Sequence, residues 1–277
     1  ESTVKMMLIT GATGFVGKQV LKNLLAQGAH IRIVVRNDSV IKLNPTDKVE
    51  VIRTHNLFEE DQSWWEENLQ GVDTVLHLAW YAEPGHYLNS SINLECLTGS
   101  LRLASACVKV GISKFIGIGT CFEYDVRKGY LSTKTPLLPE TIYAAAKAST
   151  YFSLSNLFAL SNVDFAWCRL FYLYGEGEDS RRLVPYLIEK LSNGEPAELS
   201  SGNQIRDYSD VAEVATKLID VVTSDFTGPI NICSGIPITV REFATKIADQ
   251  YNARHLLQFG VRPDNDIDPP CVVGVLS

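Results

Sequence analysis

Three glycines near the N-terminus constrain the fold more than any other feature of the sequence. Gly11, Gly14 and Gly17 form the pattern Gly-x-x-Gly-x-x-Gly after the apolar run Val4–Thr10 and at the start of the amphipathic run Gly14–Gln27. Gly11 permits a tight turn, Gly14 lets backbone approach a pyrophosphate, and Gly17 lets the helix pack on the strand. The N-terminus of the helix then offers free N–H groups to phosphates. The pattern predicts a dinucleotide site.

Strand-like and helix-like runs alternate through the first half of the chain. After Val4–Thr10, the strand-like runs are Ile31–Val35, Val49–Arg53, Val72–Leu78, Phe115–Thr120 and Val163–Leu170. Such alternation predicts a parallel sheet covered by helices on both faces. We therefore expect an α/β fold with a Rossmann-type doubly wound sheet in residues 1–171, to which the chain returns near 206–232. Residues 172–277, richer in loops, are expected to form mainly a smaller C-terminal α/β lobe.

Composition excludes several classes of function. The formal net charge of −7 over 277 residues argues against a general nucleic-acid binder. No run of about 20 apolar residues without charge is present, so we expect no membrane span. The six cysteines form no CxxC pair and no Cys/His cluster. This spacing predicts free thiols, a cytoplasmic location and no metal site.

The end of the second strand-like run bears on the choice of dinucleotide. Binders of NAD usually place Asp or Glu there, where it holds the ribose 2′-hydroxyl. Here Arg36 follows the run Ile31–Val35. A guanidinium grips a 2′-phosphate in bidentate fashion, so the sequence favours NADP. The alternative is that Asp38 takes the acidic role and the cofactor is NAD.

A Tyr-x-x-x-Lys pair places a phenol and an ammonium on one face of a helix. The chain contains four such pairs: Tyr124/Lys128, Tyr130/Lys134, Tyr143/Lys147 and Tyr186/Lys190. Only Tyr143/Lys147 opens a long helical run, and it follows a strand that ends in the hydroxyl of Thr120. We therefore predict that Tyr143 and Lys147 act together, with Lys147 lowering the pKa of the phenol.

At these positions the chain resembles the extended short-chain dehydrogenases/reductases, in the branch of NAD(P)-dependent sugar-nucleotide epimerases and dehydratases. The resemblance extends over nearly the whole chain and implies a substrate site in the smaller lobe. The segments that carry it are Thr10–Gly17, Asn56-Leu57, Val72–Ala79, Asn93, Arg169–Gly175, Arg206–Ala212 and Asn231–Gly235.

The resemblance implies a role for each catalytic residue. Thr120 would hydrogen-bond the reacting oxygen, Tyr143 would exchange its proton as general acid/base, and Lys147 would also bind the nicotinamide ribose. The dinucleotide would carry the hydride. The predicted cofactor site consists of Gly11, Thr13, Gly14, Phe15, Val16, Gly17, Arg36, Asn56, Leu57, Leu78, Ala79, Asn93, Tyr143 and Lys147.

The predicted substrate is a nucleotide-diphosphate sugar. By resemblance, Arg206 would bind the diphosphate through charge-assisted bonds. Tyr172 replaces the Asn that the family usually has at this position, and Arg181 and Arg182 are candidates to compensate for the lost contact. The predicted substrate site consists of Tyr81, His86, Cys121, Tyr172, Arg181, Arg182 and Arg206.

The two residues after Thr120 limit which reactions the chain is expected to catalyse. Family 4,6-dehydratases place Asp-Glu there, whereas this chain has Cys121-Phe122, so we expect no dehydratase activity. The favoured reaction is NADP-dependent reduction of a nucleotide-linked 4-keto-6-deoxyhexose. The alternatives are an NAD-dependent 4-epimerase, a reductase of another carbonyl compound, and a dinucleotide-binding redox sensor. The resemblance also implies a homodimer through the helices Leu88–Val110 and Thr141–Leu160.

Overall fold

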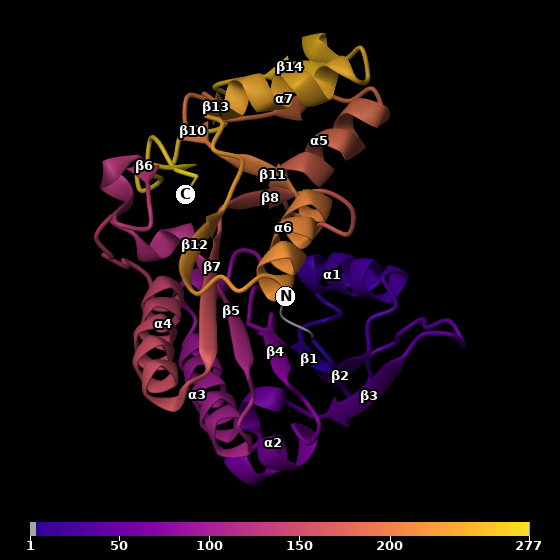
Figure 1. Cartoon of the computed structure of the whole chain (residues 1–277). Helices are drawn as coiled ribbons and strands as arrows, with labels where there is room; N and C mark the ends of the chain where they lie inside the picture. Colours follow the sequence, from indigo (N-terminus) through magenta and orange to yellow (C-terminus); the bar gives the residue numbers. More distant parts are fainter. Residues whose placement is uncertain (1–3, 277) are drawn as a thin grey trace.

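A computed structural model describes residues 4–276 and shows a seven-stranded sheet at the centre of the larger lobe (Figure 1). All neighbouring strands are parallel, in the order β12-β7-β5-β4-β1-β2-β3. The predicted doubly wound α/β fold is confirmed. Residues 1–3 and Ser277 of the predicted lobe ranges lie outside the described part. The strands are β1 Met7–Thr10, β2 Ile31–Arg36, β3 Val49–Thr54, β4 Thr74–His77, β5 Lys114–Thr120, β7 Asp164–Leu170 and β12 Gly228–Ile232.

Helices cover both faces of this sheet because successive residues of a strand point to opposite sides. Met7 and Ile9 of β1 pack in the core shared with α1 (Phe15–Ala26) and α6 (Val211–Thr223). The neighbouring Leu8 belongs to the core on the other face, which three further helices cover. Those helices are α2 Gln62–Asn68, α3 Ile92–Val110 and α4 Ile142–Ser161.

The two long helices have clear end signals. The side chain of Thr141 accepts the N–H of Ala144 and caps the start of α4. Gly111 ends α3 with a φ of 75°, in the left-handed region. The predicted helix Leu88–Val110 begins four residues later, at Ile92, because residues 87–89 form a separate 3-10 turn.

The smaller lobe packs around its own core of residues from α5 (Leu183–Ser192) and α7 (Val240–Asp249). Short two-stranded pairings complete it. Their strands are β8 Tyr172–Tyr174, β9 Ala197–Glu198, β10 Ile205–Arg206, β11 Tyr208–Asp210, β13 Ile238–Thr239 and β14 Leu257–Gln258. Further 3-10 helices are η1 Leu57–Glu59, η2 Tyr87–Asn89, η3 Cys121–Glu123, η4 Val126–Lys128 and η5 Arg254–Leu256.

The chain crosses between the lobes more than once. After β7 the chain enters the smaller lobe, and it then returns to the larger lobe through α6 and adds β12 beside β7. Near the C-terminus, β15 (Val273–Gly274) pairs with β6 (Tyr130–Leu131), and the side chain of Asn231 donates to the carbonyl of Val275. The end of the described chain therefore lies next to the loops that follow β5.

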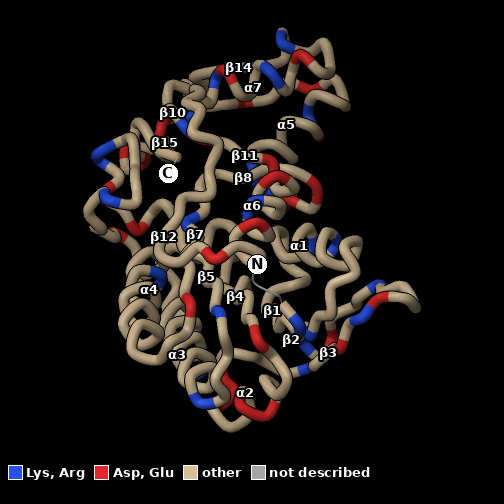
Figure 2. The backbone as a smooth tube through the Cα atoms, in the orientation of Figure 1, with Lys and Arg blue, Asp and Glu red and all other residues tan. Residues whose placement is uncertain are grey.

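Acidic and basic residues are interspersed along both lobes (Figure 2). Among residues 4–276, no helix has both the length and the apolar character needed to cross a membrane.

Candidate active site

The first of two neighbouring cavities lies at the carboxyl edge of the sheet, where the strand order reverses between β1 and β4. In doubly wound sheets this is the usual place for a ligand. The cavity measures about 350 Å³. Of the residues predicted to bind the cofactor, it brings together Gly11, Thr13, Gly14, Arg36, Asn56, Leu57, Leu78 and Ala79.

The three glycines meet different constraints. Gly11 has a φ of +74°, and a Cβ there would lie 2.6 Å from the backbone nitrogen of Ala79. A Cβ on Gly17 would lie 1.8 Å from the carbonyl oxygen of Gly11. Gly14 is different: its backbone is extended, with a φ of −76°, and a Cβ would meet only the oxygen of Gly11 at 3.4 Å. The protein itself tolerates a methyl group at position 14, so this glycine keeps space for a ligand and the cradle fits a dinucleotide.

Arg36 is exposed at the end of β2 and lines this first cavity. Arg53 of β3 supports the loop that follows, because its Nη1 donates to the carbonyl oxygens of Arg36, Asn37 and Ser39. In the part of the chain that the structure describes, no Asp or Glu lines the cavity. Position 36 therefore offers a cation where binders of NAD offer a carboxylate.

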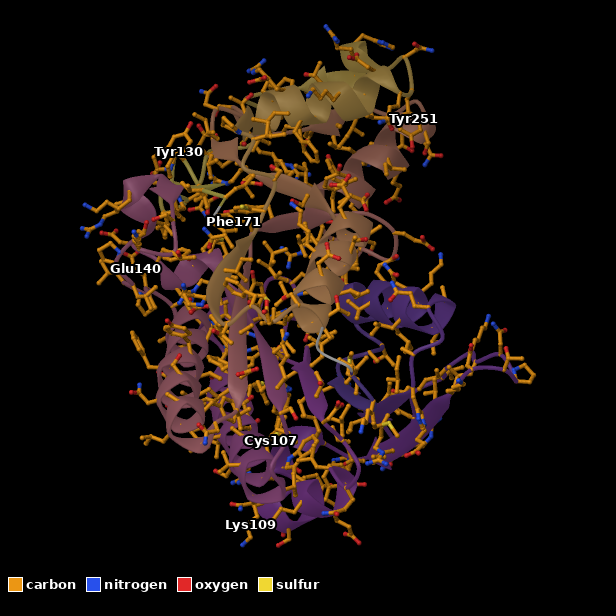
Figure 3. The ribbon with its side chains drawn as sticks, viewed as in Figure 1. Cys107, Lys109, Tyr130, Glu140, Phe171 and Tyr251 are labelled. Carbon is orange, nitrogen blue, oxygen red and sulfur yellow. The ribbon has the colours of Figure 1, made fainter. Side chains whose placement is uncertain are left out.

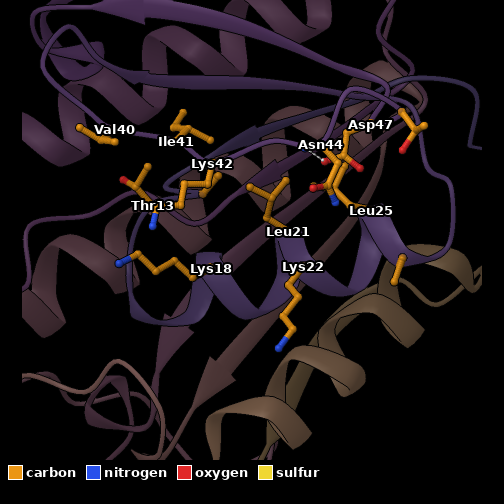
Figure 4. Close-up of a pocket in the computed structure, with 13 residues that line it drawn as sticks. Thr13, Lys18, Leu21, Lys22, Leu25, Val40, Ile41, Lys42, Asn44 and Asp47 are labelled. Carbon is orange, nitrogen blue, oxygen red and sulfur yellow. Dashed lines mark hydrogen bonds between the residues drawn. The ribbon is translucent and has the colours of Figure 1, made fainter.

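A further cavity of about 610 Å³ lies between α1 and the loop at residues 40–47 (Figure 4). Lys18, Lys22 and Lys42 border it, and all three are exposed. Thr13 borders both this cavity and the first one. The side of the glycine turn that faces this loop is therefore basic.

The second cavity at the sheet edge, of about 520 Å³, brings Thr120 and Tyr143 to one wall. Thr120 is the last residue of β5, and its side-chain oxygen accepts the N–H of Phe122. The ring of Tyr143 packs edge-on against Tyr87, with the ring centroids 4.8 Å apart. Among the other predicted residues, Phe15, Tyr172 and Arg182 also line this cavity. The remaining walls include the apolar Phe122, Phe171 (labelled in Figure 3) and Leu173. The carboxylates Glu178 and Asp179, from the loop before α5, also line the cavity.

Lys147 lies on α4 one turn after Tyr143, as predicted, but it lines neither cavity. It is buried, its Nζ donates to the carbonyl oxygen of Ile118 at 2.7 Å, and it lies 4.1 Å from the centroid of the Trp80 ring. Burial lowers the pKa of Lys147 to about 8, while the negative charge of Glu123 opposes this shift. Burial also raises the pKa of Tyr143, with Tyr87 and Glu123 adding to the increase. Lys147 is not among the groups that shift the pKa of Tyr143 here, so the lowering of this pKa by Lys147 stays a prediction.

Asn93 is buried behind the site and hydrogen-bonds residues that border it. Its Oδ1 accepts the indole N–H of Trp80 at 2.8 Å, and its Nδ2 donates to the carbonyls of Tyr87 and Ser90. Asn93 is fully buried, so the structure shows it supporting Trp80 and η2 and does not place it at either cavity. Trp80 was absent from the prediction, although an aromatic residue directly after Ala79 was a visible signal.

Several predicted residues do not reach the second cavity. Cys121 is buried in a small core, where burial raises its pKa to about 12, so the thiol is neutral. Val16 packs against the sheet core, Tyr81 lines the first cavity, and His86 is exposed outside both. Gly17 lies under the glycine turn.

The three predicted arginines differ in position. Arg182 lines the second cavity, 5.8 Å from the centroid of the Tyr87 ring. The guanidinium of Arg181 makes two hydrogen bonds to Asp179, which lines the second cavity, and reaches Glu83 at 3.6 Å. Arg181 itself does not line the cavity. Arg206 is buried, with its guanidinium 5.2 Å from the centroid of the Tyr172 ring. Because Tyr172 lines the cavity and Arg206 does not, the structure brings only Arg182 to the wall.

The sequence is similar to a known family and to characterised relatives over most of its length. A family model described as "NAD dependent epimerase/dehydratase family" matches residues 7–233. A dTDP-6-deoxy-L-talose 4-dehydrogenase (NAD(+)) from Aggregatibacter actinomycetemcomitans is 24% identical over 97% of this chain and 98% of its own length. UDP-glucuronic acid decarboxylase 1 from Arabidopsis thaliana is 21% identical over 95% of this chain, which spans only 62% of that relative.

Structure comparison points to the same fold. The structure of a UDP-N-acetylglucosamine 4-epimerase from Methanobrevibacter ruminantium M1 superposes with a TM-score of 0.86 at 24% identity. The match covers 100% of this chain and 91% of that one. At this identity the likeness shows the shared fold.

Proposed function

We propose that this chain, which belongs to the NAD dependent epimerase/dehydratase family, reduces a nucleotide-linked 4-keto-6-deoxyhexose at C4 with a nicotinamide dinucleotide. The observation that carries the proposal is the second cavity at the carboxyl edge of the sheet. Thr120 and Tyr143 border it together, and the next two positions hold the buried Cys121 and the apolar Phe122. A hydroxyl pair supports proton transfer at one oxygen, whereas elimination of water needs further acid and base groups. The two carboxylates of the cavity, Glu178 and Asp179, come from the loop before α5 and not from the positions after Thr120.

The residues at this site have different roles in the proposed reduction. Thr120 hydrogen-bonds the C4 oxygen, and Tyr143 donates its proton to that oxygen as general acid. The raised pKa of Tyr143 keeps the phenol protonated at neutral pH, which suits reduction. Lys147 does not line this cavity, and it would reach the ribose next to the nicotinamide only if its ammonium left the carbonyl of Ile118. The apolar part of the wall, with Phe122, Phe171 and Leu173, limits access of water. The bound dinucleotide supplies the hydride.

For the cofactor we favour NADP over NAD. Arg36 lines the first cavity, and the neighbouring surface at Lys18 and Lys42 is also basic. These cations attract a 2′-phosphate. The dehydrogenase from A. actinomycetemcomitans is named as an NAD(+) enzyme, so NAD is the alternative that the cofactor experiment must test.

For the substrate we favour a nucleotide-diphosphate sugar whose diphosphate contacts Arg182. Arg206 lies 5.2 Å from the ring centroid of Tyr172 and does not line the cavity, so it would contact the diphosphate only after a rearrangement of the site. The A. actinomycetemcomitans relative, named as a 4-dehydrogenase of a dTDP-linked 6-deoxysugar, supports this substrate class.

One experiment separates these alternatives. The purified protein is analysed for bound dinucleotide and then supplied with NADPH or NADH and nucleotide-linked 4-keto-6-deoxyhexoses carrying dTDP, UDP, GDP or CDP. Consumption of NADPH with one nucleotide supports the proposed reductase. NAD that co-purifies and is recycled without net consumption supports the 4-epimerase. Binding of dinucleotide without turnover, unchanged by Tyr143→Phe, supports a redox sensor.

We further propose that the protein is a cytoplasmic homodimer that pairs through α3 and α4. The six cysteines are free, as expected in a reducing compartment. Large apolar side chains of these helices are exposed, among them Leu94 and Phe152 at 54% each. Light scattering of the purified protein tests the dimer, and Phe152→Glu should shift the mass toward that of the monomer.

A further inference from the structure

A buried carboxylate that has no role in the chemistry above contacts the catalytic threonine. Glu123 is fully buried on η3, and its Oε2 accepts the backbone N–H of Thr120 at 2.7 Å. Its oxygens also accept the indole N–H of Trp167 at 3.1 and 3.2 Å and the Nε of Arg169 at 3.1 Å. The carboxylate therefore fixes the backbone of the residue whose hydroxyl faces the cavity.

Strand β5 is built to accommodate this group. A Cβ on Gly119 would lie 2.4 Å from Oε2 of Glu123 and 2.2 Å from Nε1 of Trp167. A Cβ on Gly117 would lie 2.6 Å from the Trp167 ring. Two positions of a central strand therefore lack side chains because Glu123 and Trp167 occupy the space.

Arg169 connects the carboxylate to the rest of the site. Its Nη1 donates to the hydroxyl of Tyr124, which donates to Oδ1 of Asn231 on β12 at 2.6 Å. Its guanidinium also lies 4.6 Å from the ring centroid of Tyr151 on α4, the helix that carries Tyr143 and Lys147. Burying an ion pair stabilises a fold little, and apolar residues often serve as well. The position of the pair beside the catalytic residues therefore points to a role in the reaction.

We propose that Glu123 is a positioning residue, which fixes Thr120 at the end of β5 and keeps a buried negative charge beside the Tyr143–Lys147 pair. The inference rests on the proposed function, because these residues matter only if they carry the proton transfer. The titration of Lys147 needs no substrate, so its outcome is independent of the proposed reaction.

Trp167 lies between the carboxylate and Lys147: Glu123 accepts its indole N–H, and Nζ of Lys147 lies 6.0 Å from the centroid of its ring. Burial raises the pKa of Glu123, and the charge of Arg169 opposes that rise. Burial lowers the pKa of Lys147 to about 8, and Glu123 is the first of the groups that oppose the shift. The titratable groups that face Lys147 or Tyr143 come from every neighbouring element. They are Glu123 and Cys121 of η3, Cys96 of α3, His77 of β4 and Tyr87 of η2. Glu178, Asp179 and Arg182 also line the cavity that Tyr143 borders. Without the carboxylate, Lys147 would lose its proton closer to neutral pH.

The experiment is a titration of Lys147 in the full chain by NMR of ¹³Cε-labelled lysine. The Lys147 resonance is identified by its absence from Lys147→Met. In Glu123→Gln we expect the inflection below the value of about 8 in the unmodified protein. Asp207→Asn is the matched control, since Asp207 is an equally buried carboxylate that accepts the N–H groups of Ser234 and Gly235 instead. It should leave the Lys147 titration unchanged.

Two further variants separate charge from folding. Glu123→Gln leaves Arg169 unpaired in the interior, so Glu123→Gln with Arg169→Met is measured beside it. Because this double variant also removes the cation of Arg169, it should show a downward shift of the Lys147 pKa that is smaller than in Glu123→Gln alone. Glu123→Asp keeps the negative charge but moves the carboxylate away from the N–H of Thr120. The pKa of Lys147 should therefore stay as in the unmodified protein, while kcat falls and the KM for the dinucleotide stays constant.

An unchanged Lys147 titration in folded Glu123→Gln or in the double variant overturns the inference. A lack of turnover by the unmodified protein with every nucleotide sugar would instead refute the proposed function, and the titration would still decide the role of Glu123.

Discussion

Replacing Gly14 or Gly17 by alanine should distinguish the glycine that leaves room for a ligand from the glycine that the packing of the protein requires. A Cβ at position 17 would lie 1.8 Å from a backbone oxygen, against an ordinary contact of at least 3.4 Å. Backbone must move to relieve this, so we place Gly17→Ala at the upper end of overpacking costs, about 3 kcal/mol. For a chain of this size, that lowers Tm by roughly 6 °C.

Gly14→Ala should behave in the opposite way. The backbone of Gly14 is extended and its Cβ position is free of close contacts, so alanine should stabilise the protein by about 0.4–1 kcal/mol through the unfolded state. The methyl group would, however, occupy the space kept for a pyrophosphate. At a dinucleotide concentration of about 100 times Kd, the unmodified protein gains about 2.7 kcal/mol. We expect most of that gain to disappear.

The assay is thermal unfolding with and without NADPH or NADH. Gly28→Ala is a control: Gly28 has a φ of +74° with nothing within 4 Å, so it reports backbone strain without a clash. The reasoning would be refuted if Gly14→Ala kept the full shift on adding dinucleotide. It would also be refuted if Gly17→Ala unfolded at the temperature of the unmodified protein.

Three further predictions concern the catalytic cavity and its support. Tyr143→Phe should lower kcat by about 10²–10⁴-fold and leave dinucleotide binding intact, as measured by steady-state kinetics and fluorescence titration. Arg182→Ala should raise the KM for the nucleotide sugar by about tenfold or more, because it removes a charge-assisted contact, whereas Arg181→Ala should change it little. His77 is buried and neutral, with a pKa lowered to about 3 by burial and by Lys147. As the pH falls below 6.5, His77 takes up a proton in the unfolded chain but not in the folded protein. The free energy of unfolding should therefore decrease by about 1.4 kcal/mol for each pH unit between 6.5 and about 3. Denaturant unfolding at pH 7 and pH 4 should show a smaller acid loss in His77→Gln, and an equal loss would count against this explanation.

The sequence predicted the features that depend on local pattern. The alternation of strands and helices, the glycine turn and the placing of Tyr143 at the start of α4 all depend on neighbouring residues. The last of these required context, because three other Tyr-x-x-x-Lys pairs had the same spacing. Lys147 lies at the predicted place on the helix, but the direction of its ammonium depends on Ile118 and Trp80, which come from other elements.

What the sequence did not predict depends on contacts between distant residues. Arg181 and Arg182 are adjacent, yet Arg181 is held by Asp179 and Glu83 while its neighbour lines the cavity. Glu123 resembles a surface residue until β7 supplies Trp167 and Arg169 as partners. Such contacts are set by the packing of β5 against β7 and leave no periodic pattern along the chain.

The repeated crossing of the chain between the lobes limits how such enzymes can be recombined. The segment after β7 that builds α5 is separated from α7 by α6 and β12, which belong to the larger lobe. No single cut transfers the smaller lobe to another member of the family. A chimera that exchanges it must join the parents after β7, before α6 and after β12, and must also take the β15 partner that suits β6. Exchange of complete lobes is therefore harder than gradual substitution along the cavity walls.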